Sequence, residues 1–185
     1  MIATLGFCVL MLALLFVDLF TKTLAVAYGF NQPDYFLGLI RFNYTENPGI
    51  AFGIAADNRP AMIAITVLTF ALIIGIAVLF FTIFKKNRPV QACLAVIEAG
   101  AVGNLVDRLC LGYVRDFVDV SPTGFGICNI ADFFITGGAV VLCFIILFIG
   151  PSAVFPLKKA WREEAKRREE QEKQEKQEKQ KKKNG

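Results

Sequence analysis

Histidine is absent from the 185-residue chain, and serine occurs only twice, at Ser121 and Ser152. Without histidine, the chain contains no Ser-His or Cys-His nucleophile pair and no HExxH zinc site. The cysteines lie singly in or beside apolar runs, without CxxC spacing, so we expect buried free thiols rather than metal ligands or disulfides. Carboxylates are the one well-supplied class of acid–base side chain, and no metal or organic cofactor is expected.

Long apolar runs dominate the sequence, of which 55% is hydrophobic. A helix needs about 20 apolar residues to cross hydrocarbon. Four runs meet this length, and they are residues 2–27, 61–84, 90–111 and 131–155. We therefore expect one membrane domain over residues 1–157. The charged tail, 158–185, repeats Gln-Glu-Lys without an apolar stripe, and is expected to be a solvated helix or disordered.

The orientation follows from the basic residues Lys85, Lys86 and Arg88 in a very short connection, together with the basic tail. Basic connections lie on the cytoplasmic side of membranes. Both termini are then cytoplasmic, and residues 28–59 and 112–130 lie outside. No small-residue cleavage site follows the first run, so we expect a retained span rather than a signal peptide.

Residues 28–59 are expected to form a small cap outside the bilayer. Apolar and polar residues alternate over 40–45, which is typical of a half-buried strand. The sequence Asn47-Pro48-Gly49 predicts a turn, and residues 50–53 either return as a second strand or dip toward the membrane. An extended edge here can pair with a peptide backbone, although an inert loop has a similar sequence.

Several polar side chains fall at one depth, in the outer part of the expected spans. Ionisable residues inside a membrane segment cost several kcal/mol unless they are paired or face a cavity. The residues concerned are Asp18, Lys22, Asn104, Asp107, Arg108 and Asp132. Asp18 and Lys22 share a helix face, as a pair that either ties neighbouring helices or shapes a polar pocket. Arg108 is expected to pair with Asp107 or another carboxylate, or else to snorkel at a helix end.

Structural alternatives exist for the remaining candidates. An Asn at position 129 followed by Asp132 is a sound helix N-cap. Asp116 in the outer loop can be an ordinary solvated residue, and Glu98 receives no role.

Five segments, taken in order, match a known family. They are Asp18-Leu-Phe-Thr-Lys22, Asn47-Pro-Gly-Ile-Ala-Phe-Gly53, Gly103-Asn-Leu-Val-Asp-Arg108, Val114-Arg-Asp-Phe117 and Asn129-Ile-Ala-Asp132. On these motifs the chain resembles the bacterial lipoprotein signal peptidases, or signal peptidase II. The resemblance implies an aspartyl protease of the inner membrane that cuts prolipoproteins before their diacylglyceryl-modified cysteine.

The resemblance also implies roles for individual residues. The catalytic pair would be Asp116 and Asp132. Residues that support the site or contact substrate would be Asn104, Asp107, Arg108, Asn129, Asn47, Gly49, Asp18 and Lys22. The chain departs from the usual pattern at Arg115 and Cys128, where the family has a small apolar residue and Phe.

We therefore predict an all-α membrane protein of four transmembrane helices with a small extracytoplasmic β-containing cap. It is expected to be a monomer with its active site near the outer face of the membrane. Its partners would be prolipoproteins and membrane lipid, with no nucleic acid. Asp132, in a first helical turn, would hold the charge and Asp116 the proton. The alternatives are a transporter or channel with a carboxylate proton relay, a structural membrane subunit, and a presenilin-type protease, which the lack of Gly-x-Gly-Asp disfavours.

Overall fold

The computed structural model describes most of the membrane domain and four residues of the tail: residues 2–49, 58–84 and 87–149, with 163, 167, 170 and 171. The chain divides into two compact units, residues 1–143 and 144–185. Everything that bears on the site belongs to the first unit.

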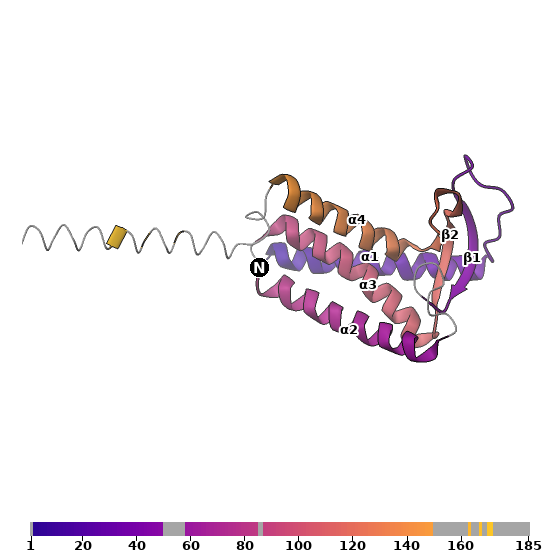
Figure 1. The fold of residues 1–185 in the computed structure, drawn as a ribbon, viewed down its shortest axis with the longest axis horizontal. Coiled ribbons are helices and arrows are strands. Elements are labelled where there is room, and N and C mark those ends of the chain that lie inside the picture. Colours follow the sequence, from indigo (N-terminus) through magenta and orange to yellow (C-terminus); the bar gives the residue numbers. More distant parts are fainter. Residues whose placement is uncertain are drawn as a thin grey trace, which may run out of the picture. The chain divides into compact units, whose positions relative to one another are not determined.

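Four long apolar helices confirm the expected fold class (Figure 1). They are α1 (Ile2–Ala27), α2 (Arg59–Phe81), α3 (Arg88–Cys110) and α4 (Ile130–Phe144), the last followed by a π-helical turn over Ile145–Ile149. Each apolar helical stretch is long enough to cross a membrane, the fourth when its π-turn is included.

The second and third helices begin two residues earlier than expected, at Arg59 and Arg88. Each is preceded by an asparagine whose side-chain oxygen accepts a hydrogen bond from a first-turn amide. Asn58 accepts from the amide of Ala61 at 3.1 Å, and Asn87 accepts from that of Val90 at 3.4 Å. Asparagine caps therefore set these boundaries, which hydropathy alone misplaces. The basic residues 85 and 86 lie outside the described residues.

Helix α3 is the central helix and packs against both α1 and α2. In its membrane-spanning window 61% of the residues are buried, against 17% or less in the other three spans. Small residues allow this close packing. A Cβ atom added at Gly100 would collide with the carbonyl oxygen of Ala131 at the start of α4, and one at Gly103 would collide with the Asp18 carboxylate on α1. These glycines hold three helices together at the depth of the polar residues.

A three-stranded antiparallel sheet, in the order β1-β2-β3, lies at one end of the helices (Figure 1). Its strands are β1 (Arg41–Asn47), β2 (Val114–Asp119) and β3 (Ile127–Cys128). The expected strand near 40–45 is confirmed, but its neighbour, β2, comes from the segment between α3 and α4. Asp116 was expected in a connecting loop; it lies instead within β2, opposite Thr45. The expected return of residues 50–53 falls outside the described residues.

An apolar cluster packs around the sheet. Its buried centre is Ala25 of α1 with Phe117 and Val118 of β2. The ring of Phe30 packs edge-on against Phe117, with centroids 6.0 Å apart. This cluster fastens β2 to α1, so the strand that carries Asp116 is held against the helices.

Candidate active site

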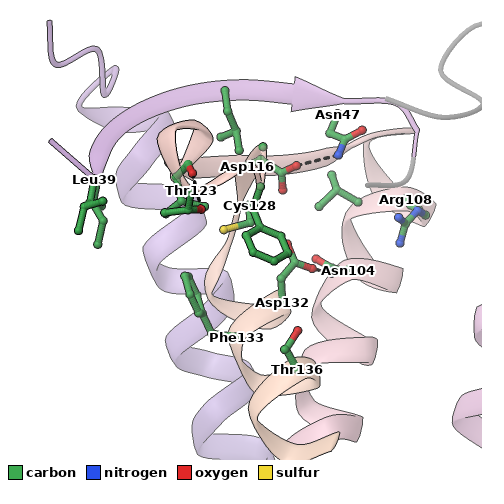
Figure 2. A pocket seen from close by; sticks show the side chains of 16 residues that line it. Leu39, Asn47, Asn104, Arg108, Asp116, Thr123, Cys128, Asp132, Phe133 and Thr136 are labelled. Carbon is green, nitrogen blue, oxygen red and sulfur yellow. Dashed lines mark hydrogen bonds between the residues drawn. The ribbon is translucent and has the colours of Figure 1, made fainter. Parts of the chain in front are cut away.

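Asp116 and Asp132 line the same cavity, which has a volume of about 600 Å³ (Figure 2). Asp116 comes from β2, and Asp132 comes from the first turn of α4. The rest of the lining combines apolar side chains with a few polar ones, and consists of Leu39, Ile40, Asn47, Asn104, Arg108, Val114, Val120, Thr123, Phe125, Gly126, Ile127, Cys128, Phe133 and Thr136. The fold therefore brings together two carboxylates that are sixteen positions apart in sequence.

Asp116 is buried, with 3% of its surface exposed. The side-chain amide of Asn47 donates to one carboxylate oxygen at 2.8 Å, and that of Asn129 donates to the other at 2.6 Å. Burial raises the pKa of Asp116 to about 6 and the charge of Asp132 adds to the rise, although the two amide hydrogen bonds oppose it. Asp116 thus keeps its proton up to about pH 6, well above the range of an ordinary aspartate.

Asp132 is held by a capping arrangement at the start of α4. Its carboxylate accepts a hydrogen bond from the backbone amide of Asn129 at 3.1 Å, while the Asn129 side-chain oxygen accepts from the Asp132 amide at 3.1 Å. The other carboxylate oxygen accepts from the Asn104 side-chain amide at 2.9 Å. The helix cap expected for Asn129 and Asp132 is therefore present, and the same bonds orient the Asp132 carboxylate toward the cavity that it lines.

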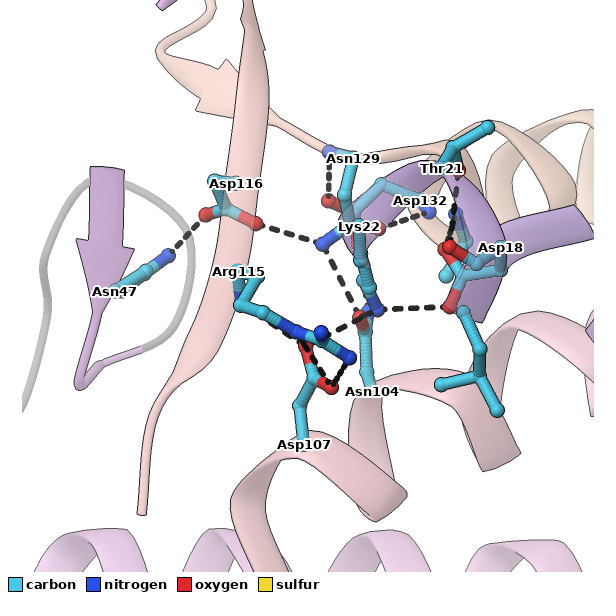
Figure 3. Close-up of polar contacts among 12 residues, drawn as sticks. Asp18, Thr21, Lys22, Asn47, Asn104, Asp107, Arg115, Asp116, Asn129 and Asp132 are labelled. Carbon is cyan, nitrogen blue, oxygen red and sulfur yellow. Dashed lines mark hydrogen bonds and ion pairs between the residues drawn. The ribbon is translucent and has the colours of Figure 1, made fainter. Parts of the chain in front are cut away.

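The side chains of Asn129 and Asn104 connect the two carboxylates (Figure 3). Besides its bond to Asp116, the Asn129 amide donates to the Asn104 side-chain oxygen at 3.1 Å. Asn104 in turn donates to Asp132. Two hydrogen-bonded side chains therefore couple the two carboxylates.

Lys22 lies behind this chain of hydrogen bonds, fully buried. Its ammonium group donates to the Asn104 oxygen at 2.9 Å and pairs with Asp18 at 2.8 Å and Asp107 at 3.5 Å. Removing one partner of such a buried pair leaves an uncompensated charge, which is strongly destabilising.

Asp18 also accepts a hydrogen bond from the backbone amide of Ala131 at 2.9 Å. It therefore joins α1 to the start of α4, next to Asp132. Neither Asp18 nor Lys22 lines the cavity. The pair therefore ties helices together, which was one of the two expectations. It contacts the site through Asn104 and through the backbone of Ala131.

Arg108 was expected to pair with Asp107 or another carboxylate, or to snorkel at a helix end, and the structure does not pair it with Asp107. Asp107 instead pairs with Arg115 of β2, whose guanidinium donates at 2.7 Å and whose backbone amide donates at 3.0 Å. Arg108 faces the cavity and donates only weakly to the Gly49 carbonyl, at 3.4 Å. Within the described residues it forms no ion pair. The cation that binds Asp107 is Arg115, which belongs to strand β2. The spacing of residues along α3 does not reveal where that strand lies.

Asp119 is a buried polar residue whose role was not predicted from the sequence. It is 1% exposed and pairs with Arg41 of β1, the residue opposite it in the sheet, at 2.8 Å. The sequence does contain a signal for this position, because an aspartate that is followed two residues later by Ser121 and then by a proline is typical of a turn.

Two carboxylates in one confined site do not ionise together easily, so one can donate a proton while the other activates water. In the part of the chain that the structure describes, no three metal-ligating side chains cluster. Four apolar helices and this pair define a multi-pass membrane protein with the acid–base groups of an aspartic hydrolase.

Comparison with known proteins identifies the family. The sequence model of signal peptidase (SPase) II matches residues 10–148. A lipoprotein signal peptidase of Caldanaerobacter subterraneus subsp. tengcongensis is 38% identical over 140 residues, covering 73% of this chain and 91% of that protein. One of Caldicellulosiruptor bescii is 37% identical over 144 residues, covering 77% and 91%. The chain belongs to the signal peptidase II family of aspartic peptidases.

Solved structures agree with this placement. Two bacterial membrane enzymes determined by the in meso method, at 1.9 and 2.3 Å resolution, superpose with TM-scores of 0.66 and 0.65. Both are 26% identical to this chain and cover 77% of it, which corresponds to 94% and 88% of their own lengths. The four helices and the small sheet are therefore those of a membrane enzyme.

Proposed function

We propose that this chain removes the signal peptide from prolipoproteins, cutting before a diacylglyceryl-modified cysteine, with Asp116 and Asp132 as its catalytic pair. The observation that carries the proposal is that both carboxylates line one cavity and are joined through Asn129 and Asn104. The family and its relatives' names supply the substrate class. The walls of the cavity are largely apolar, which suits the apolar side chains of a signal peptide.

The chemistry follows from the proton carried by Asp116. Asp132, ionised at the start of α4, takes a proton from water, and the water oxygen attacks the scissile carbonyl carbon. Asp116 gives its proton to the carbonyl oxygen, which yields a neutral tetrahedral intermediate. When the C–N bond breaks, the proton on Asp132 passes to the leaving amine and Asp116 recovers its own, so the pair is restored.

Arg108 and Asn47 are assigned to substrate contact. The Nε atom of Arg108 is buried and has no hydrogen-bond partner among the described residues. The Arg108 side chain lines the same cavity as both carboxylates, so its guanidinium can donate to a peptide carbonyl. Asn47 ends strand β1, lines the cavity and donates to Asp116, and its side-chain oxygen accepts a hydrogen bond from the Gly49 amide.

The deciding experiment uses purified protein and a lipid-modified precursor. Wild-type protein should release the signal peptide, and should leave the unmodified precursor intact. Asp116→Asn and Asp132→Asn should each abolish release, and the double variant should lose little more, because the pair acts as a unit. Asp34→Asn, at an exposed position, is the matched control. Substantial cleavage by either single variant would disprove the assignment of the pair.

We further propose that the protein lies in the cytoplasmic membrane as a monomer, with both termini inside and the site at the outer face. The basic connection at 85–88 supports this orientation. One chain supplies both carboxylates, so a second copy is not needed. A cysteine-labelling map should find positions near Asp34 accessible from outside and positions near Lys85 from inside; the reverse pattern contradicts the orientation. The substrate then enters laterally, with its acyl chains among the lipid tails.

A further inference from the structure

Asp119 joins two separate segments of the chain, one that contains Tyr35 and Arg41 and one that begins at Ser121. One of its carboxylate oxygens accepts from the backbone amide of Ser121 at 2.9 Å and from the Ser121 hydroxyl at 2.5 Å. The other oxygen accepts from Arg41 at 2.8 Å and from the Tyr35 hydroxyl at 3.0 Å. Four hydrogen bonds thus converge on one buried carboxylate, two from each segment.

Each of the two segments continues into the wall of the cavity. Arg41 directly follows residues 39–40, both of which line it. Ser121 begins the 3-10 turn Ser121–Thr123, which leads to the lining residues 125–127. Leu39 and Thr123 lie on the same side of the cavity in Figure 2, away from Arg108. Asp119 therefore links the two segments that build this apolar side.

Asp119 itself stands outside the cavity lining. It is three residues after Asp116 in β2, and side chains three apart on a strand point to opposite faces. Asp116 faces the cavity, so the Asp119 carboxylate lies on the other face of the strand. It can act on bound substrate only through the segments that it holds.

Two further features stabilise the hydrogen bonds to Asp119. The guanidinium of Arg41 lies over the ring of Tyr35, 4.5 Å from its centroid, so the two donors also support each other. Although burial opposes ionisation, the hydrogen bonds from Ser121, Arg41 and Tyr35 lower the pKa of Asp119 to about 2. The carboxylate therefore stays charged and the linkage intact throughout the physiological pH range.

We propose that Asp119, held by Arg41, Tyr35 and Ser121, is a positioning residue that fixes the apolar side of the cavity and thereby sets the affinity for the substrate. This inference rests on the proposed function, because it concerns the substrate of that same site. The bond-making groups, Asp116 and Asp132, keep their hydrogen bonds when the linkage is broken. The effect should therefore fall on KM rather than on kcat.

The test measures KM and kcat for release of the signal peptide by Asp119→Asn, Tyr35→Phe and Arg41→Lys. We expect KM to rise about tenfold in Asp119→Asn, which loses the charge that holds both segments, and about threefold in Tyr35→Phe, which loses one hydroxyl. Arg41→Lys keeps the cation and should fall between the wild type and Asp119→Asn. In all three, kcat should stay within about twofold of wild type. Asp34→Asn removes an exposed charge from the same outer segment and should leave both constants unchanged.

Hydrogen–deuterium exchange supplies a second readout. In Asp119→Asn, amides of both segments, 36–41 and 121–127, should exchange faster, while those of α3 should not. An unchanged KM in Asp119→Asn and Tyr35→Phe, or a loss confined to kcat, would overturn the inference. If Asp119→Asn does not fold, Tyr35→Phe still decides the question, because it removes only one hydroxyl. Failure of the proposed function looks different, since the wild type would then leave the precursor uncut or Asp116→Asn would remain active.

Discussion

Replacing Asp116 by asparagine should make the protein more stable at pH 8 while abolishing turnover. The pKa of Asp116 is raised to about 6 in the folded protein, chiefly by burial, against about 3.9 for an unfolded aspartate. The folded state therefore favours the protonated carboxyl. Its contribution to stability is fully present below about pH 4 and is lost as the pH rises through about 6. Above that pH, the buried charge destabilises the fold.

The magnitude follows from the shift. Two pKa units correspond to about 3 kcal/mol at pH 8, since each unit is worth about 1.4 kcal/mol. Asparagine carries no charge, so it avoids this cost. It also has only one acceptor oxygen to offer the amides of Asn47 and Asn129, and losing one of these bonds costs about 1–2 kcal/mol at every pH. The net gain should be about 1–2 kcal/mol at pH 8, turning to a loss of similar size at pH 4.

Thermal unfolding in detergent, at pH 4 and pH 8, measures this change. The difference in Tm between variant and wild type should grow by roughly 6–12 °C from the lower to the higher pH, given about 2–4 °C per kcal/mol for a chain of this size. Asp119→Asn is the matched control on the same strand. The pKa of Asp119 is lowered to about 2, so its charge stabilises the fold above about pH 4, and its loss should cost about 1–2 kcal/mol at pH 8 after allowance for solvent screening. The reasoning fails if the effect of Asp116→Asn is the same at both pH values.

Three further substitutions probe the supports of the site. Gly103→Ala should destabilise the protein by about 1–3 kcal/mol in thermal unfolding, because its Cβ collides with a carboxylate on α1, whereas Gly75→Ala, with open space around it, should not. Arg115→Ala should lower kcat/KM about tenfold, and Arg115→Lys should recover part of the loss; equal activity in all three proteins would show that the strand is held without this pair. Asn47→Ala removes a hydrogen bond that lowers the pKa of Asp116, so the alkaline limb of the pH–rate profile should move to higher pH, and an unmoved limb would contradict that role.

The helices and the gathering of polar residues could be predicted from the sequence, because hydrocarbon imposes strict rules. Long apolar runs must be helical in a membrane. Charged residues within them must be paired or face a cavity, so Asp18 and Lys22 were expected to pair and Asp107 to lie at the same depth; the structure joins all three in ion pairs. Helix spacing also placed Asn129 and Asp132 at a helix start, where they lie. These rules need only residues that are close together in the sequence, or the depth of a residue in the membrane.

Contacts that depend on the sheet were not predictable. The alternation near residue 42 indicates a strand, but it does not identify the strand that pairs with it. That partner is β2, whose register sets Asp116 opposite Thr45 and Asp119 opposite Arg41. The ion pair between Arg115 and Asp107 depends on the same placement, which is why helical spacing alone offered Arg108, rather than Arg115, as a partner for Asp107.

The charges around the site support a single shared proton. Four carboxylates lie there against three cations: Asp18, Asp107, Asp116 and Asp132 against Lys22, Arg108 and Arg115. Fully ionised, the cluster would carry one uncompensated negative charge among buried side chains, which is costly in a medium of low polarity. One proton makes it neutral. The pKa of Asp116 is raised to about 6, so Asp116 can hold this proton, which is the one that the proposed mechanism transfers. The helix pairs that stabilise the fold and the protonation state needed for catalysis thus have the same electrostatic origin.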